Sequence, residues 1–122
     1  MFELMIDKLR KDPKTIVFTE GSDPRILEAA SRLASGNFLR PILLGDPDEI
    51  YAAAKETGFA IGDCELINPL TYDRLDEMID LFCELRKKKG VTPEEARGML
   101  SKSNYFGTML VKMGVADALL GG

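Results

Sequence analysis

The chain has 122 residues, of which 16 are basic and 20 acidic, and 45% of them are hydrophobic, as in an ordinary globular protein. This length suits one domain, and the net charge of −4 argues against a nucleic-acid module, which would carry a basic face. The absence of His excludes Ser-His-Asp and Cys-His nucleophile systems and every His-ligated metal site. Cys64 and Cys83 are far apart in the sequence and are expected to be reduced thiols.

The sequence predicts no membrane segment. A membrane helix needs about 18 consecutive apolar residues, and no part of the chain approaches that length. Residues 1–10 place apolar side chains at helical spacing with charged residues between them, which predicts an amphipathic surface helix. A signal peptide would instead show a continuous apolar stretch. We therefore expect a cytoplasmic protein without a membrane partner.

Short apolar runs alternate with helical patterns along the rest of the chain. A β-branched or aromatic run that is too short for a helix predicts a strand, and a one-sided apolar pattern predicts a helix. Asp23, Asp46 and Thr92 each precede a proline and mark three helix starts. Strands are expected over residues 15–19, 41–45, 65–68 and 118–120, and helices over residues 24–35, 47–57, 72–88, 92–100 and 105–113.

This order of elements indicates the fold class. Strands that alternate with helices predict βαβ crossovers and a parallel sheet. The strands are nearly continuous apolar runs, as expected when helices cover both faces of the sheet. The prediction is an α/β fold, a three-layer α/β/α sandwich with a mostly parallel sheet, whose strand order the pattern does not determine.

The loop over residues 19–25 is the first candidate binding site. Ligands of open parallel sheets bind at the carboxyl ends of the strands, where this loop is expected to lie. Gly21 permits close backbone approach, the following helix start favours an anion, and Arg25 adds a charged donor. An ordinary capped turn with a solvated Arg25 explains the same residues. No dinucleotide or Walker A glycine pattern is present.

A basic run at the end of the longest predicted helix is the second candidate. Residues 86–89 read Arg-Lys-Lys-Lys, and cations are favoured at a helix C-terminus whether or not they bind a ligand. A phosphate clamp is the competing interpretation, with Arg86 as its best member because a planar guanidinium can grip a phosphate with two hydrogen bonds. Ser101, Ser103 and Tyr105 are interpreted as loop, cap or core residues, since no His accompanies them.

The last residues suggest an incomplete domain. The expected strand at residues 118–120 runs directly into Gly121 and Gly122, the glycines of a βα loop, and the sequence stops there. The helix that would normally cover this part of the sheet is missing. The sequence therefore predicts a fragment of something longer, or an unusual truncated product.

Four segments together resemble the phosphate acetyltransferase (phosphotransacetylase) family. They are residues 15–27 (TIVFTEGSDPRIL), 41–45 (PILLG), 84–92 (ELRKKKGVT) and 104–122 (NYFGTMLVKMGVADALLGG), which follow one another in the family's order. The resemblance implies an isocitrate- or isopropylmalate-dehydrogenase-like fold of two α/β/α domains and a homodimer. Residues 1–122 would then be the N-terminal part of the first domain. The resemblance also implies the reaction acetyl-CoA + phosphate = acetyl phosphate + CoA, without a metal, with coenzyme A as a substrate and no further cofactor. Phosphate butyryltransferase and the acyltransferase-like region of some malic enzymes share parts of the pattern.

The resemblance assigns binding residues but no catalytic residue. Arg86 matches a coenzyme-A-binding arginine by motif, and Arg25 and Ser22 are carried over more weakly as cleft-facing loop residues. The groups that the family uses to orient the thiol and stabilise charge lie beyond Gly122. We therefore expect this chain alone to be inactive, and a non-catalytic module that binds coenzyme A or a partner remains the alternative.

Overall fold

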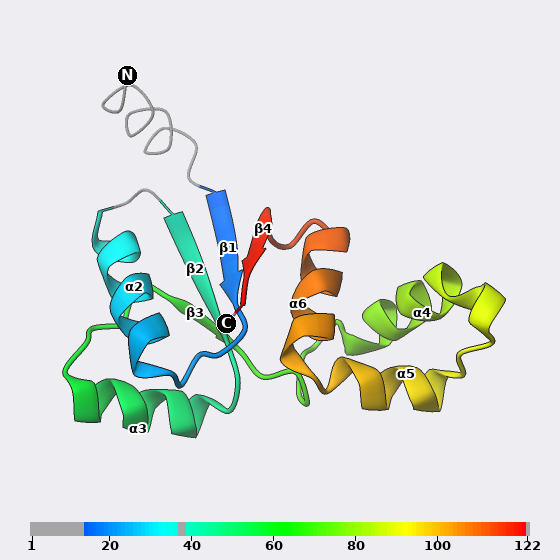
Figure 1. Cartoon of the computed structure of the whole chain (residues 1–122), viewed down its shortest axis with the longest axis horizontal. Helices are drawn as coiled ribbons and strands as arrows, with labels where there is room; N and C mark the ends of the chain where they lie inside the picture. The colour runs from blue at the N-terminus through cyan, green and yellow to red at the C-terminus, as the bar shows by residue number, and fades with distance from the viewer. Residues whose placement is uncertain (1–13, 37–38, 122) are drawn as a thin grey trace, which may run out of the picture.

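A computed structural model describes residues 14–36 and 39–121 of the chain (Figure 1). The predicted helix over residues 1–10 lies outside this part. The elements follow in the order β1 (Lys14–Phe18), α2 (Pro24–Ser35), β2 (Leu39–Leu44), α3 (Pro47–Thr57), β3 (Glu65–Ile67), α4 (Leu75–Leu85), the 3-10 turn η1 (Lys87–Lys89), α5 (Pro93–Leu100), α6 (Ser103–Lys112) and β4 (Ala118–Leu120).

The strands form one parallel sheet in the order β3-β2-β1-β4. β1 lies between its two partners, with Phe18 opposite Leu43 on one side and Leu120 on the other. Val17 and Phe18 are adjacent in β1 and both are fully buried, which means that both faces of the sheet are covered. The predicted α/β fold with a parallel sheet is confirmed.

Two apolar cores, one on each face, make the predicted three layers. Phe18 and Leu43 pack with Leu27 of α2 and Ile50 of α3 on one face. On the other face, Val17, Ile42 and Leu44 belong to a core that also takes side chains from α4, α5 and α6. Figure 1 shows α2 and α3 on one side of the sheet and α6 on the other, with α4 and α5 beyond α6.

The capped helix starts are confirmed. The Asp23 and Asp46 carboxylates accept the backbone N–H of Arg25 and Asp48, and each is followed by a proline, which has no N–H to leave unsatisfied. Thr92 forms a complete capping box with Glu95 at the start of α5.

The longest predicted helix is shorter in the structure than its predicted range and matches the span of its apolar face, Leu75 to Leu85. α4 begins at Leu75 because the chain turns first, with the Leu75 N–H donating to the carbonyl of Tyr72. It ends at Leu85, and the three lysines that follow form a separate 3-10 turn closed by Gly90 at φ +65°. The prediction of one helix over residues 72–88 is therefore wrong at both ends.

The strand predicted over residues 41–45 is shifted in the structure. β2 begins at Leu39 and contains Pro41, which pairs with Ile16 of β1. β3 pairs with β2 only from Ile42 onward, so the missing N–H of Pro41 lies where the strand has a single neighbour.

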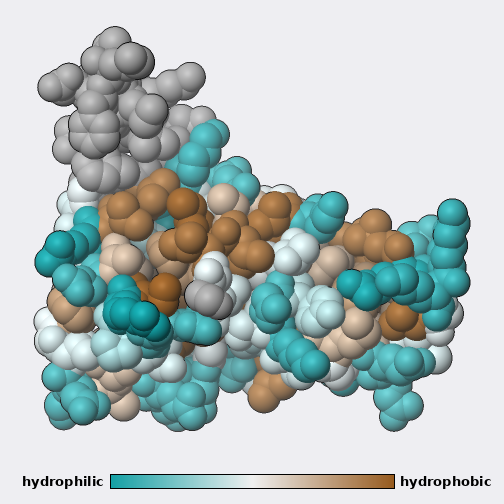
Figure 2. Space-filling view, in the orientation of Figure 1, coloured by the Kyte–Doolittle hydropathy of each residue, from teal (hydrophilic) through white to brown (hydrophobic). Residues whose placement is uncertain are grey.

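Apolar side chains gather around β4 on the face seen in Figure 2. Leu120, at the end of β4, is 51% exposed, whereas Leu119 packs against the core on the α6 side. Within the described ranges, no helix has the length and apolar character needed to cross a membrane.

Candidate functional site

A hollow of about 550 Å³ lies at the carboxyl edge of the sheet, and we call it the carboxyl-edge hollow. It forms where β1 and β2 end and α2, α3 and α6 begin. Ser22 is exposed and lines it, as the sequence predicts for a loop residue at this edge. Its lining consists of residues 19–24 together with Leu44, Gly45, Glu49 and Ser103.

Gly21 fixes the loop of this hollow against the neighbouring strand. Its N–H donates to the carbonyl of Leu44 at 3.1 Å. A Cβ at this position would lie 2.7 Å from the same carbonyl oxygen and 2.9 Å from Cδ1 of Ile50. The close approach that the sequence suggested for a ligand is therefore used by the protein itself, to pack the loop on β2.

Arg25 is paired within its own loop and does not line the hollow. Its guanidinium donates to the Asp23 carboxylate at 3.1 Å, and its side chain is 89% exposed and absent from the lining. The hydrogen bond from the Arg25 side chain, with the one from its backbone N–H, lowers the pKa of Asp23. The start of α2 is thus already occupied by an internal anion.

The charge of the carboxyl-edge hollow is negative. Glu20, Asp23 and Glu49 contribute carboxyl groups, and no cation is present among the residues that line it. A phosphate group entering here would meet like charges, which disfavour it.

Arg86 has a different environment, at the C-terminal end of α4. Its guanidinium carbon lies 4.7 Å from the ring centroid of Phe82 and 5.5 Å from that of Tyr105. The two rings meet edge to face, with centroids 6.4 Å apart at 89°. We call these three residues the Arg86 corner. Phe82 is buried in the core, whereas Arg86 and Tyr105 are half-buried.

The first turn of α6 contributes a residue to both the carboxyl-edge hollow and the Arg86 corner. Ser103 lines the carboxyl-edge hollow, and Tyr105, two residues later, forms one wall of the Arg86 corner. From the sequence, Ser103 and Tyr105 are interpreted as loop, cap or core residues. The sequence does not predict their positions beside the carboxyl-edge hollow and the Arg86 corner. The spacing of four residues between Phe82 and Arg86 in one helix was a usable signal, but the approach of Tyr105 depends on how α6 packs against α4.

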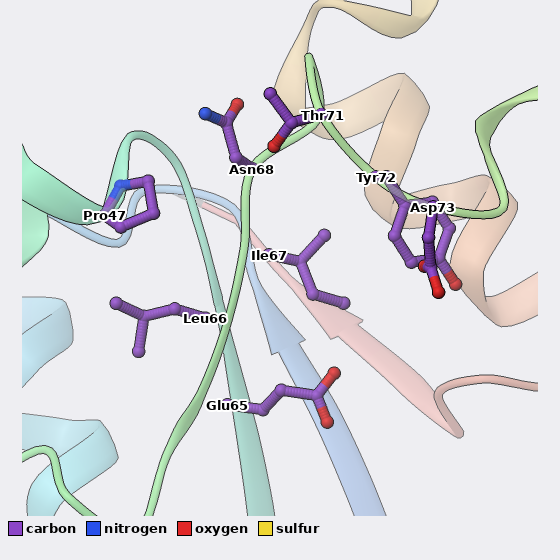
Figure 3. A pocket seen from close by; sticks show the side chains of 8 residues that line it. All are labelled: Pro47, Glu65, Leu66, Ile67, Asn68, Thr71, Tyr72 and Asp73. Atoms are coloured by element: carbon purple, nitrogen blue, oxygen red, sulfur yellow. The ribbon is translucent and has the colours of Figure 1, made fainter.

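A second hollow, of about 320 Å³, lies beside the end of β3 (Figure 3). Glu65 points toward the side on which Tyr72 and Asp73 lie, whereas Leu66 points to the opposite side. The Tyr72 ring packs edge-on against Phe106 at 5.3 Å, and burial raises the pKa of its hydroxyl. The two carboxyl groups and the packed ring make this hollow unsuitable for a phosphate.

Other reactive groups do not form a catalytic cluster. Cys64 and Cys83 are free thiols, and burial, with Asp63 nearby, raises the pKa of Cys64 and so disfavours its nucleophilic thiolate form. Across residues 14–36 and 39–121, no three Asp, Glu or Cys side chains come together as a metal site would require.

A family model described as phosphate acetyl/butaryl transferase matches residues 1–122. Among curated proteins, the phosphate acetyltransferase of Bacillus subtilis is 43% identical over the whole chain, which corresponds to 38% of that protein. The phosphate acetyltransferase of Corynebacterium glutamicum is 42% identical over 97% of the chain and 36% of its own length.

Two solved phosphotransacetylase structures are also similar to the chain over nearly its whole length. The EutD phosphotransacetylase of Staphylococcus aureus superposes on 98% of the chain with a TM-score of 0.92 and 41% identity. A phosphotransacetylase of Streptococcus pyogenes covers 99% of the chain with a TM-score of 0.90 and 43% identity. In both cases 36% of the solved chain is matched, so this chain spans a little over a third of its relatives.

Proposed function

The chain belongs to the phosphate acetyl/butaryl transferase family, and from this premise we propose that it forms the N-terminal part of an enzyme that transfers an acetyl group between coenzyme A and phosphate. The observation that carries the proposal is identity of 43% over the entire chain to a phosphate acetyltransferase. Because the chain spans only 38% of that relative, the activity is proposed for the longer protein of which this segment would be one portion.

Acetyl is the proposed acyl group. The family description includes both acetyl and butyryl transfer, but the two relatives compared above are phosphate acetyltransferases. We expect acyl preference to depend mainly on residues outside this segment.

The reaction is a direct displacement at a thioester. A phosphate oxygen attacks the carbonyl carbon of acetyl-CoA, the C–S bond breaks, and the proton released by phosphate neutralises the departing thiolate. Holding both substrates in one cleft supplies much of the rate by orientation, and fixed positive charge stabilises the oxyanion that forms. We assign no general base within this segment.

Arg86 is the proposed anchor for a phosphate of coenzyme A. Its side chain carries a permanent charge and has no carboxylate partner among the described residues, unlike Arg25, which is paired with Asp23. Ser22 is retained as a wall of the carboxyl-edge hollow, and Arg25 as a flanking residue of lesser effect.

The remaining expectations concern assembly and compartment. We propose a homodimer for the longer protein, on the family resemblance alone. A cytoplasmic location is supported by the two free thiols, which suit a reducing compartment.

An assay of acetyl-CoA formation from acetyl phosphate and coenzyme A tests the proposal. A family-length protein carrying these 122 residues should turn over at a rate proportional to enzyme, with butyryl phosphate a poorer donor. The 122-residue chain alone should show no turnover, because it matches little more than a third of its active relatives. An inactive family-length protein would contradict the proposed activity. Turnover by the 122-residue chain alone would contradict the expectation that this segment is inactive by itself.

A further inference from the structure

Arg86 is set apart from most of the other arginines of the described chain. Arg25, Arg32, Arg74 and Arg97 each pair with a carboxylate, namely Asp23, Glu28, Glu77 and Asp76. The Arg86 side chain lies over two aromatic rings and forms no hydrogen bond or ion pair with another residue in the described ranges.

The two aromatic rings hold the Arg86 guanidinium without neutralising its positive charge. An aromatic ring attracts a cation through the negative face of its π system, and stacking against a ring uses none of the five N–H donors of the guanidinium. A carboxylate partner would instead occupy the donors that a ligand phosphate needs. The Arg86 corner therefore restricts the side chain and keeps its donors available.

The backbone adds to this restriction. Arg86 caps α4, with its N–H donating to the carbonyls of Phe82 and Cys83. Its own carbonyl accepts the N–H of Lys89 in the turn that follows. The following lysines, Lys87 to Lys89, are all exposed, and Lys87 pairs with Glu84 at 3.2 Å. Of these four described basic residues, only Arg86 lies over aromatic rings.

We propose that Tyr105 is a positioning residue for Arg86: its ring, with that of Phe82, holds the guanidinium so that the N–H donors can bind a phosphate of coenzyme A. The inference rests on the proposed function and extends it to a residue that does not itself contact the substrate. Phe82 serves the same purpose from within the core, which makes Tyr105 the residue to test.

Kinetics of the family-length protein, with CoA as the varied substrate, test this role. Tyr105→Leu removes the π system but keeps an apolar side chain, and we expect it to raise KM for CoA by about five- to tenfold with little change in kcat, the range of a cation–π contact. Tyr105→Phe keeps the ring and should change KM by less than about twofold. Tyr51→Leu, at an exposed tyrosine of α3, is the matched control and should resemble the unsubstituted protein.

A double variant separates positioning from general packing. If Tyr105 acts through Arg86, Tyr105→Leu should have no further effect on KM in an Arg86→Ala background. In NMR spectra, Tyr105→Leu should also remove part of the ring-current shift of the Arg86 Nε–H signal. Tyr105→Met provides the same comparison if Tyr105→Leu does not fold.

The outcomes distinguish this inference from the proposed function. If Arg86→Ala leaves KM for CoA unchanged, the proposed anchor is wrong and the positioning role with it. If Arg86→Ala raises KM but Tyr105→Leu behaves like Tyr105→Phe, or its effect persists without Arg86, the anchor stands and the positioning role of Tyr105 is overturned.

Discussion

The loop over residues 19–25 and the Arg86 corner each contain an arginine that the sequence suggested for phosphate, but they differ in what surrounds that arginine. Arg25 donates to Asp23 two residues away, so its charge is matched within the loop. Arg86 is held by Phe82 and Tyr105, which attract its charge and leave it uncompensated. The comparison shows that two arginines of similar sequence promise differ in their N–H donors: those of Arg25 are shared with a carboxylate, whereas those of Arg86 are shared with none in the described part of the chain.

A glycine allows close packing on each side of the sheet, but with a different consequence. In the loop, Gly21 is needed because the backbone of β2 occupies the adjacent space. On the other side of the sheet, Gly107 lets α6 approach β1 and β4, and this approach sets where Ser103 and Tyr105 lie. If this is correct, substitutions at Gly21 and Gly107 should lower stability, whereas substitution of Arg86 should weaken the binding of CoA.

The largest effect is expected for Gly21→Ala. The added Cβ would lie 2.7 Å from the backbone oxygen of Leu44, which cannot move without disturbing β2. We expect the free energy of unfolding to fall by about 3 kcal/mol, the upper part of the range for overpacking. Denaturant unfolding measures it, with Gly62→Ala as the control, because a Cβ there would meet nothing within 4 Å. Equal stability of the two variants would show that the loop is not packed as described.

A smaller effect is expected at Gly107, with a matched glycine in another helix. A Cβ on Gly107 of α6 would lie 2.6 Å from Cδ1 of Leu119 and 3.0 Å from Cγ1 of Val17. Because side chains can yield more than backbone, Gly107→Ala should cost about 1–2 kcal/mol. In Gly98→Ala, within α5, the Cβ meets nothing, and the variant should gain about 0.5–1 kcal/mol from helix propensity. A gain at both positions would contradict the close packing of α6.

The smallest effect concerns the pKa of Asp23. The Arg25 side chain lowers this pKa, so Arg25→Ala should raise it toward the usual value of about 3.9, although the Arg25 backbone N–H continues to lower it. A carboxyl whose pKa is lowered on folding stabilises the fold above its unfolded pKa, and this contribution is lost as the pH falls through the folded pKa. Carboxyl-carbon NMR titration measures the shift. An unchanged pKa would mean that Arg25 is not engaged by Asp23 and is available to a ligand.

Much of the fold could be predicted from local sequence signals. Pro24, Pro47 and Pro93 follow capping residues, and these three helix starts lie where the sequence places them. The apolar face ends at Leu85, where α4 ends, but the three lysines that follow carry no local signal that distinguishes a continued α-helix from the 3-10 turn that they form.

The candidate site was less predictable, because its properties depend on contacts between distant elements. Ser22 lines the carboxyl-edge hollow as expected from its place after β1. The pairing of Arg25 with Asp23 could have been predicted, because the two residues are two positions apart in the sequence. The contact between Arg86 and Tyr105 joins residues in α4 and α6, and only the packing of those helices reveals it.

The most direct test of the central claim is the dependence of rate on CoA concentration for Arg86→Ala, Arg25→Ala and Lys88→Ala in the family-length protein. We predict that Arg86→Ala raises KM for CoA by about 10- to 150-fold, equivalent to the 1.5–3 kcal/mol of a lost charged hydrogen bond, with much less effect on kcat. Arg25→Ala should raise KM by no more than about threefold, and Lys88→Ala, at an exposed lysine of η1, should do little. Equal small effects of Arg86→Ala and Lys88→Ala would contradict the account and show that residues 86–89 are only a solvated helix end.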